Sequence, residues 1–96
     1  MFVVSITYIK PLDVIDNFIK EHVEYLNTHY KLGHFQLSGR KVPRTGGIIL
    51  ATVESRAKLD QILSNDPFFR ENLANYEVIE FVPTMSSKAL ELLVEA

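Results

Sequence analysis

The chain has 96 residues, 47% of them hydrophobic, and a net charge of −2. This length suits one domain, residues 1–96, and the absence of cysteine excludes disulfides, thiol catalysis and cysteine-bound metal. The lysines and arginines are dispersed and no apolar run approaches the ~20 residues that span a bilayer, so we expect no nucleic-acid or membrane partner.

The first half of the chain predicts a strand, a long helix and a second strand. Residues 2–9 are rich in β-branched and aromatic side chains, which favours a strand over a signal peptide, so we expect a cytoplasmic protein. Residues 12–31 have the apolar spacing of one long helix, which Gly33 ends in a left-handed conformation. Residues 35–38 form a short second strand, and a connection follows over residues 39–47.

The second half predicts two further strands and two helices. Residues 47–53 form the third strand, and Ser55 can cap a helix over Arg56–Leu63. Residues 76–82 form the fourth strand, and residues 86–96 a short C-terminal helix. The order β-α-β-β-α-β is that of the ferredoxin-like fold, an α+β arrangement with two helices on one face of an antiparallel sheet.

The first and third predicted strands are apolar on both faces. Such strands need cover on both sides, whereas the two helices can cover only one face of the sheet. No other segment is large enough to cover the second face. We therefore expect a homodimer in which the sheet faces of two copies pack together as a dimeric α/β barrel.

His22 lies on the predicted long helix where the spacing calls for a hydrophobic residue. At about 100° per residue it falls within the stripe formed by Ile15, Phe18, Ile19 and Leu26. An inward histidine is often a core residue bonded to a backbone carbonyl. The functional alternative is a general acid/base, because the ordinary pKa of histidine, about 6.5, is close to neutrality.

Asp66 is the best candidate partner for His22. It precedes Pro67, and an aspartate in this position commonly caps the N–H groups of a turn or a new helix. The same carboxylate can orient a histidine and stabilise its protonated form. Its two oxygens allow both roles at once.

Further candidate substrate contacts gather after the second strand. Ser38 and Gly39 are most simply a turn. At the mouth of a pocket, however, their hydroxyl and backbone N–H groups would meet a substrate, and Arg40 or Arg44 would bind a carboxylate or enolate.

Two aromatic residues complete the candidate site. Tyr8 ends the first strand, where a tyrosine can reach into a pocket, although we expect it mainly to pack, as we do Tyr76. Phe68 follows Asp66 closely and is expected to pack as well as to adjoin a substrate.

Metal and cofactor binding are not expected. His22, His29 and His34 lack a Glu-flanked zinc motif, and His29, near a helix end, is expected to be a surface residue or a residue that interacts with the helix dipole. Gly46 and Gly47 lack a phosphate-binding pattern and are expected to permit a tight entry into the third strand.

These motifs, in this order and spacing, resemble the YciI-like family (YCII-related domain), small dimeric α/β-barrel proteins similar to muconolactone isomerases. The resemblance covers residues 2–84 and is carried by Pro11-Leu12, His22 with Leu26, Phe35 with Ser38-Gly39, Arg44-Thr45-Gly46-Gly47-Ile48-Ile49, Asp66-Pro67-Phe68 and Tyr76-Glu77-Val78-Ile79-Glu80-Phe81. It implies a ferredoxin-like fold, a dimer, and an active site containing His22 and Asp66, with Ser38 beside them. Residues 85–96 lie beyond the shared core.

Activities in related proteins include cofactor-free isomerisation and dehydrochlorination of oxidised aromatic breakdown products. The combined interpretation is a cofactor-independent enzyme of the isomerase, lyase or dehydrochlorinase type. It would transfer a proton on a small cyclic or aromatic-derived metabolite through a dyad of His22 and Asp66. The alternatives are a non-catalytic small-molecule-binding or accessory module, and a structural latch formed by the same two residues.

Overall fold

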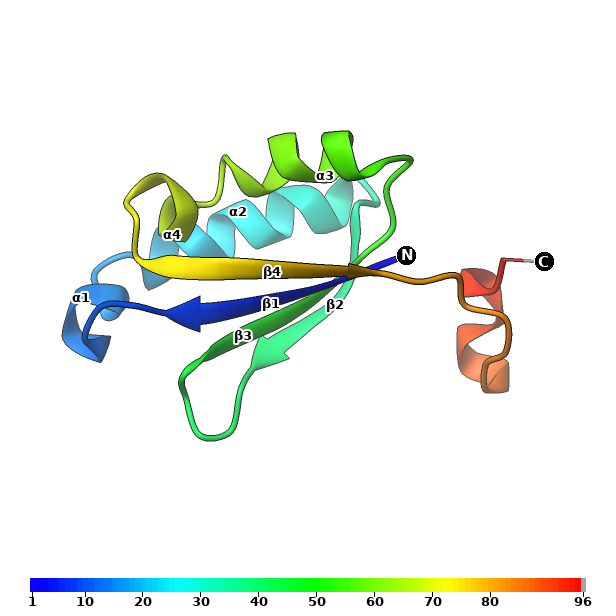
Figure 1. Cartoon of the computed structure of the whole chain (residues 1–96), viewed down its shortest axis with the longest axis horizontal. Helices are drawn as coiled ribbons and strands as arrows, with labels where there is room; N and C mark the ends of the chain where they lie inside the picture. Colours follow the sequence, from blue (N-terminus) through cyan, green and yellow to red (C-terminus); the bar gives the residue numbers. More distant parts are fainter. Residues whose placement is uncertain (96) are drawn as a thin grey trace.

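The computed structural model describes residues 1–95 and shows an α+β fold built on a four-stranded antiparallel sheet (Figure 1). The strands lie in the order β2-β3-β1-β4, as expected for a ferredoxin-like arrangement. In chain order the elements are β1 (Phe2–Tyr8), α1 (Leu12–Asp16), α2 (Ile19–Lys31), β2 (Phe35–Arg40), β3 (Gly46–Ala51), α3 (Arg56–Leu63), α4 (Pro67–Arg70), β4 (Ala74–Glu80) and the 3-10 helix η1 (Lys88–Leu93).

The core lies between the sheet and the helices α2, α3 and α4, which cover one face of the sheet in Figure 1. Alternate residues of β1 point into this layer, so Phe2, Val4 and Ile6 are almost fully buried. Ile49 of β3 lies opposite Val4 in the strand register and is buried with it. Leu59 meets them from α3, whose N-terminus is capped by Ser55 as expected.

The single long helix predicted over residues 12–31 is wrong, because the chain bends between α1 and α2. Phe18 leaves the helical conformation with φ of −113° and ψ of 1°, and α2 begins at Ile19. The bend lets α1 sit at the end of the sheet while α2 runs along its face (Figure 1). Ile15 of α1 can then enter the core, where it is fully buried.

The strand boundaries differ from the prediction at several ends. β2 extends to Arg40, so Gly39 and Arg40 belong to a strand rather than to the following connection. β3 begins at Gly46, where a Cβ atom would collide with the backbone carbonyl oxygen of Ile6, so the entry into this strand requires glycine. Gly33, with φ of 79°, follows the end of α2 as predicted.

The C-terminal segment is a short 3-10 helix, η1, in place of the predicted α-helix over residues 86–96. Ala96 lies outside the described residues. η1 projects beyond the end of the sheet opposite α1 (Figure 1). No helix within residues 1–95 combines the length and apolarity needed to cross a bilayer.

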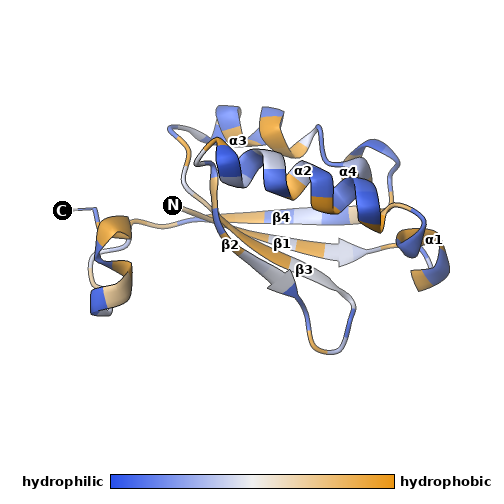
Figure 2. Ribbon diagram, turned by 180° about the vertical axis from the view of Figure 1, so that it is seen from behind, coloured by the Kyte–Doolittle hydropathy of each residue, from blue (hydrophilic) through white to orange (hydrophobic). Residues whose placement is uncertain are grey.

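The second face of the sheet carries a row of apolar side chains and is not covered by a helix of the described chain. In the strand register, Leu37, Leu50, Val3 and Ile79 lie side by side across all four strands. Leu37 and Ile79 are 62% and 65% exposed. Figure 2 shows hydrophobic residues recurring along the strands, with helices α2, α3 and α4 together on one side of the sheet.

Candidate active site

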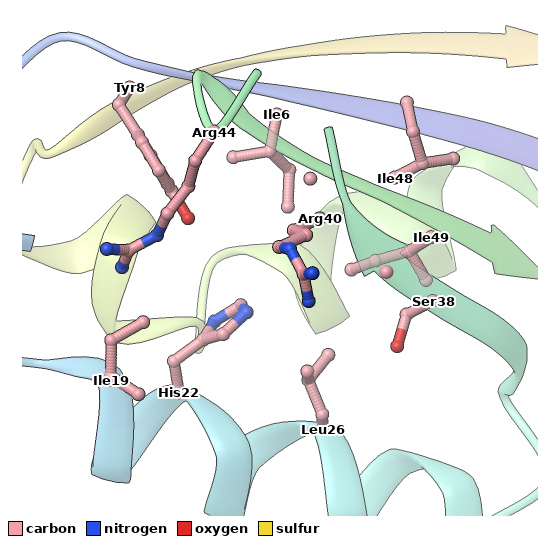
Figure 3. A pocket seen from close by; sticks show the side chains of 12 residues that line it. Ile6, Tyr8, Ile19, His22, Leu26, Ser38, Arg40, Arg44, Ile48 and Ile49 are labelled. Atoms are coloured by element: carbon pink, nitrogen blue, oxygen red, sulfur yellow. The ribbon is translucent and has the colours of Figure 1, made fainter. Parts of the chain in front are cut away.

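A cavity of about 270 Å³ opens between helix α2 and the inner face of the sheet (Figure 3). Aliphatic side chains form much of its wall, and polar groups from α2 and the ends of the strands face the same space. The lining residues are Ile6, Tyr8, Ile19, His22, Leu26, Ser38, Gly39, Arg40, Arg44, Gly47, Ile48 and Ile49. Six of the residues predicted for the site are therefore brought together: Tyr8, His22, Ser38, Gly39, Arg40 and Arg44.

Helix α2 presents His22 to the cavity with one ring nitrogen already engaged. The His22 side chain is 14% exposed, and its Nδ1 lies 2.8 Å from Oδ1 of Asp66. Because an ionised carboxylate only accepts hydrogen bonds, this contact assigns the proton to Nδ1. Nε2 is then left unprotonated in the neutral ring and is available to a bound molecule.

Asp66 is held in place by the start of α4. It is fully buried, it caps the helix, and its Oδ1 accepts a hydrogen bond of 3.0 Å from the backbone N–H of Phe68. Pro67 at the first helical position fixes the backbone for this cap. The expected capping and orienting roles thus coexist, but one oxygen, Oδ1, serves both.

The second oxygen of Asp66 accepts a hydrogen bond from Tyr76, which the sequence predicted only as a packing residue. The Tyr76 hydroxyl, on β4, donates a hydrogen bond of 2.6 Å to Oδ2. Burial, reinforced by the negative charge of Asp66, raises the pKa of Tyr76, so this hydroxyl remains a donor at neutral pH. Tyr76 lies opposite Ile6 in the register, and this inward strand position was the sequence signal that could have identified it.

Aromatic rings fix the plane of His22. Phe68 stacks on the imidazole with ring centroids 4.1 Å apart and planes at 9°. Phe68 is buried and is not among the residues that line the cavity, so its contact with the site is through the His22 ring. Tyr25 lies on the same helix, and its hydroxyl donates to the backbone carbonyl of Ile62; burial raises the pKa of Tyr25.

The two arginines of the cavity have different surroundings. Arg44 donates a hydrogen bond to Asp16 of α1, and this bond raises the pKa of Arg44. Arg40 forms no ion pair within residues 1–95. Ser38, which shares a strand with Arg40, exchanges a short hydrogen bond with the hydroxyl of Tyr30.

The other two histidines lie outside this cavity. His29 is buried, which contradicts the expected surface position, and its Nδ1 lies 3.0 Å from Nδ1 of His34. Burial and the positive charge of protonated His34 lower the pKa of His29. Within residues 1–95, no group of three or more His, Cys, Asp or Glu side chains is arranged to hold a metal ion.

The fold and site define an α+β protein in which a buried His–Asp–Tyr network adjoins a small, largely apolar cavity. The chain belongs to the YCII-related domain family, whose family model matches residues 1–82, and this confirms the resemblance drawn from its motifs. No curated protein matches the chain.

A solved structure with a similar fold is 5-chloro-2-hydroxyhydroquinone dehydrochlorinase (TftG) from Burkholderia phenoliruptrix, in complex with 2,5-dihydroxybenzoquinone. The two chains share 20% sequence identity with a TM-score of 0.72, and the match covers 86% of this chain and 95% of the other. At this identity the likeness shows the fold.

Proposed function

We propose that this protein is a cofactor-independent enzyme that transfers a proton on a small cyclic or aromatic-derived metabolite. His22 acts as the acid/base, and Asp66 orients it. The observation that carries this proposal is the 2.8 Å contact between His22 Nδ1 and Asp66 Oδ1 beside the cavity. It leaves Nε2 of His22 as the basic nitrogen for the substrate.

The proposed reaction begins when Nε2 of His22 removes a proton from the bound molecule. The imidazolium that forms is stabilised by the carboxylate of Asp66, which stays in its fixed position. His22 then returns the proton at another atom, as in an isomerisation, or yields it to solvent after a leaving group departs. General acid–base catalysis of this kind contributes roughly 10²–10⁴-fold to the rate.

Tyr76 is a positioning residue in this proposal. Its hydroxyl and the backbone N–H of Phe68 together hold the carboxylate of Asp66 by both oxygens. A carboxylate with three donors, His22 included, cannot rotate without breaking bonds in a buried site. The network therefore keeps the imidazole preorganised for proton transfer.

Residues from the strand ends would bind the substrate and stabilise the charge that develops on it. Tyr8, Ser38, Gly39, Arg40 and Arg44 line the same cavity as His22, and Figure 3 shows the side chains of Tyr8, Arg40 and Arg44 around its ring. Hydroxyl, backbone and guanidinium donors of this kind stabilise an enolate-like oxygen. The similarly folded dehydrochlorinase is complexed with a dihydroxybenzoquinone, which supports a compact oxidised ring as the type of substrate.

We further propose that two copies of the chain pair through the uncovered faces of their sheets. The apolar row of Leu37, Leu50, Val3 and Ile79 crosses the whole sheet, and its end members are largely exposed. In a symmetric dimer the same surface of both copies forms the interface, so an apolar face can pair with its own copy. Packing two such faces would remove this apolar surface from water.

Proton transfer can be tested by incorporation of solvent deuterium. A panel of hydroxyquinones, lactones and short unsaturated acids is incubated with the protein in D₂O, and the loss of proton signals is followed by NMR. We expect catalysed exchange or rearrangement of at least one compound, which His22→Ala slows by roughly 10²–10⁴-fold. His34→Ala, which removes a histidine outside the cavity, is the matched control. Equal rates for the wild type and His22→Ala would contradict the mechanism, whereas binding without exchange would favour the non-catalytic binding module.

A further inference from the structure

The charges around the cavity are one-sided. Among the described residues that line it there is no acidic side chain, whereas Arg40 and Arg44 both reach it. Asp66 does not line the cavity, and both of its oxygens already accept hydrogen bonds within the protein. A molecule that enters the cavity therefore meets guanidinium groups but no carboxylate among the described lining residues.

Only one of the two arginines is free to meet a ligand. The guanidinium of Arg44 is bonded to Asp16, which balances its charge. Arg40 has no ion-pair partner within residues 1–95, and Figure 3 shows its guanidinium pointing into the cavity. A guanidinium presents its donors as a planar fork, which matches the two oxygens of a carboxylate.

The size and walls of the cavity limit the rest of the ligand. An apolar protein cavity of about 150 Å³ holds benzene. A volume of about 270 Å³ thus accommodates a ring with a few substituents. Ile6, Ile19, Leu26 and Ile49 provide the apolar contacts for such a ring.

We propose that the ligand of this cavity is the carboxylate anion of a compact, ring-sized acid, and that Arg40 is the residue that selects it. The inference rests on the proposed function, because it names the substrate class of the same site. Arg40 binds the carboxylate, the aliphatic wall holds the ring, and His22 faces the reacting part of the molecule. Ser38, on the same strand as Arg40, lies close enough to the cavity to add a polar contact.

The test compares two probes that share a ring and differ in charge. Benzoate and benzamide are titrated into the ¹⁵N-labelled protein near neutral pH, and backbone and side-chain shifts give the two affinities. We expect wild type to prefer benzoate by about ten- to a hundredfold, the range of a charge-assisted hydrogen bond. Arg40→Gln should lose most of this preference.

Lys41→Gln is the matched control variant. It removes the same charge from the neighbouring position, but Lys41 donates its hydrogen bond to Thr7 and does not line the cavity. We expect it to keep the preference for benzoate. Failure of benzoate to bind, equal affinity for the two probes, or a preference that survives in Arg40→Gln would each overturn the inference.

These outcomes are separate from those of the proposed function, because neither titration involves proton transfer. An Arg40-dependent preference together with deuterium exchange that does not need His22 would remove the mechanism and leave the ligand class standing. Exchange that requires His22, with no Arg40-dependent preference for the acid, would support the mechanism and reject the proposed ligand class.

Discussion

Tyr76 and Asp66 are joined by a hydrogen bond of 2.6 Å from the tyrosine hydroxyl to Oδ2, and this bond ties β4 to the start of α4. Asp66 is fully buried, so water does not readily replace a hydrogen-bond donor that its carboxylate loses. His22 forms a hydrogen bond with the other oxygen, Oδ1, of the same carboxylate. The geometry of the acid/base candidate therefore depends on a residue in the fourth strand.

Tyr76→Phe should destabilise the protein markedly. The substitution keeps the ring but leaves Oδ2 of a buried carboxylate without its donor, which costs about 1.5–3 kcal/mol in the free energy of unfolding. Urea denaturation followed by circular dichroism measures the change. Tyr30→Phe is the control, because it removes a tyrosine hydroxyl from an exposed hydrogen bond and should cost much less. Equal losses for the two variants would contradict the role assigned to Tyr76.

Asp66→Asn should slow proton transfer far more than it weakens binding. An amide at this position can donate to Nδ1 of His22 and so favour the wrong tautomer, which lowers the rate by about 10²–10⁴-fold. The measurement is the deuterium-exchange rate at saturating substrate, with KM determined in parallel.

The double variant His22→Ala with Asp66→Asn provides the control for that prediction. Residues that act as one unit give non-additive losses. The double variant should therefore be no slower than His22→Ala alone. Fully additive losses would show that Asp66 acts independently of His22.

Alkaline pH should destabilise the protein through its buried tyrosines. Burial raises the pKa of both Tyr25 and Tyr76 above the ordinary value of 10.0. Above this value the unfolded chain loses protons that the folded chain keeps, so stability is present below pH 10.0 and falls as the pH rises beyond it. Urea unfolding near pH 9 and pH 11 measures this loss. Tyr76→Phe should show a smaller drop than the wild type, and an unchanged drop would contradict the assignment.

Much of the fold was predictable because its signals are local. The β-branched run of β1, the Ser55 cap and the left-handed Gly33 each act within a few residues. The bend at Phe18 was not predictable, because the apolar spacing continues on both sides of it. It arises from packing of α1 at the end of the sheet, which no local pattern records.

The candidate site was predictable only in part. His22 and Asp66 stand out as a misplaced polar residue and a capping aspartate, and the fold brings them together. In the sequence Tyr76 resembles any other strand residue, because its contact with Asp66 exists only once α4 packs against β4. Arg44 has an ion-pair partner and Arg40 has none within residues 1–95, because the fold brings Asp16 next to Arg44 alone.

Mild acid should destabilise the pair formed by His29 and His34. Burial, with the positive charge of protonated His34, lowers the pKa of His29 below its ordinary 6.5. The unfolded chain then binds this proton more readily, so the contribution to stability is complete above pH 6.5 and declines as the pH falls below it. Comparing urea unfolding near pH 7.5 and pH 5.5 should show a smaller difference in His29→Asn than in the wild type. An identical pH difference in the two proteins would contradict the role of His29.

Charges placed in the apolar row of the sheet should separate the proposed dimer. Ile79 and Leu37 point outward from β4 and β2, so Ile79→Lys and Leu37→Lys change neither the core nor the cavity. A lysine facing another copy of itself brings like charges into a desolvated interface, which opposes association. Analytical ultracentrifugation at micromolar concentration should show a dimer for the wild type and a folded monomer for the double variant. Lys58→Glu, on the helical side, is the control and should stay dimeric. A wild-type monomer, or a dimer that persists in the double variant, would show that this face of the sheet does not pair.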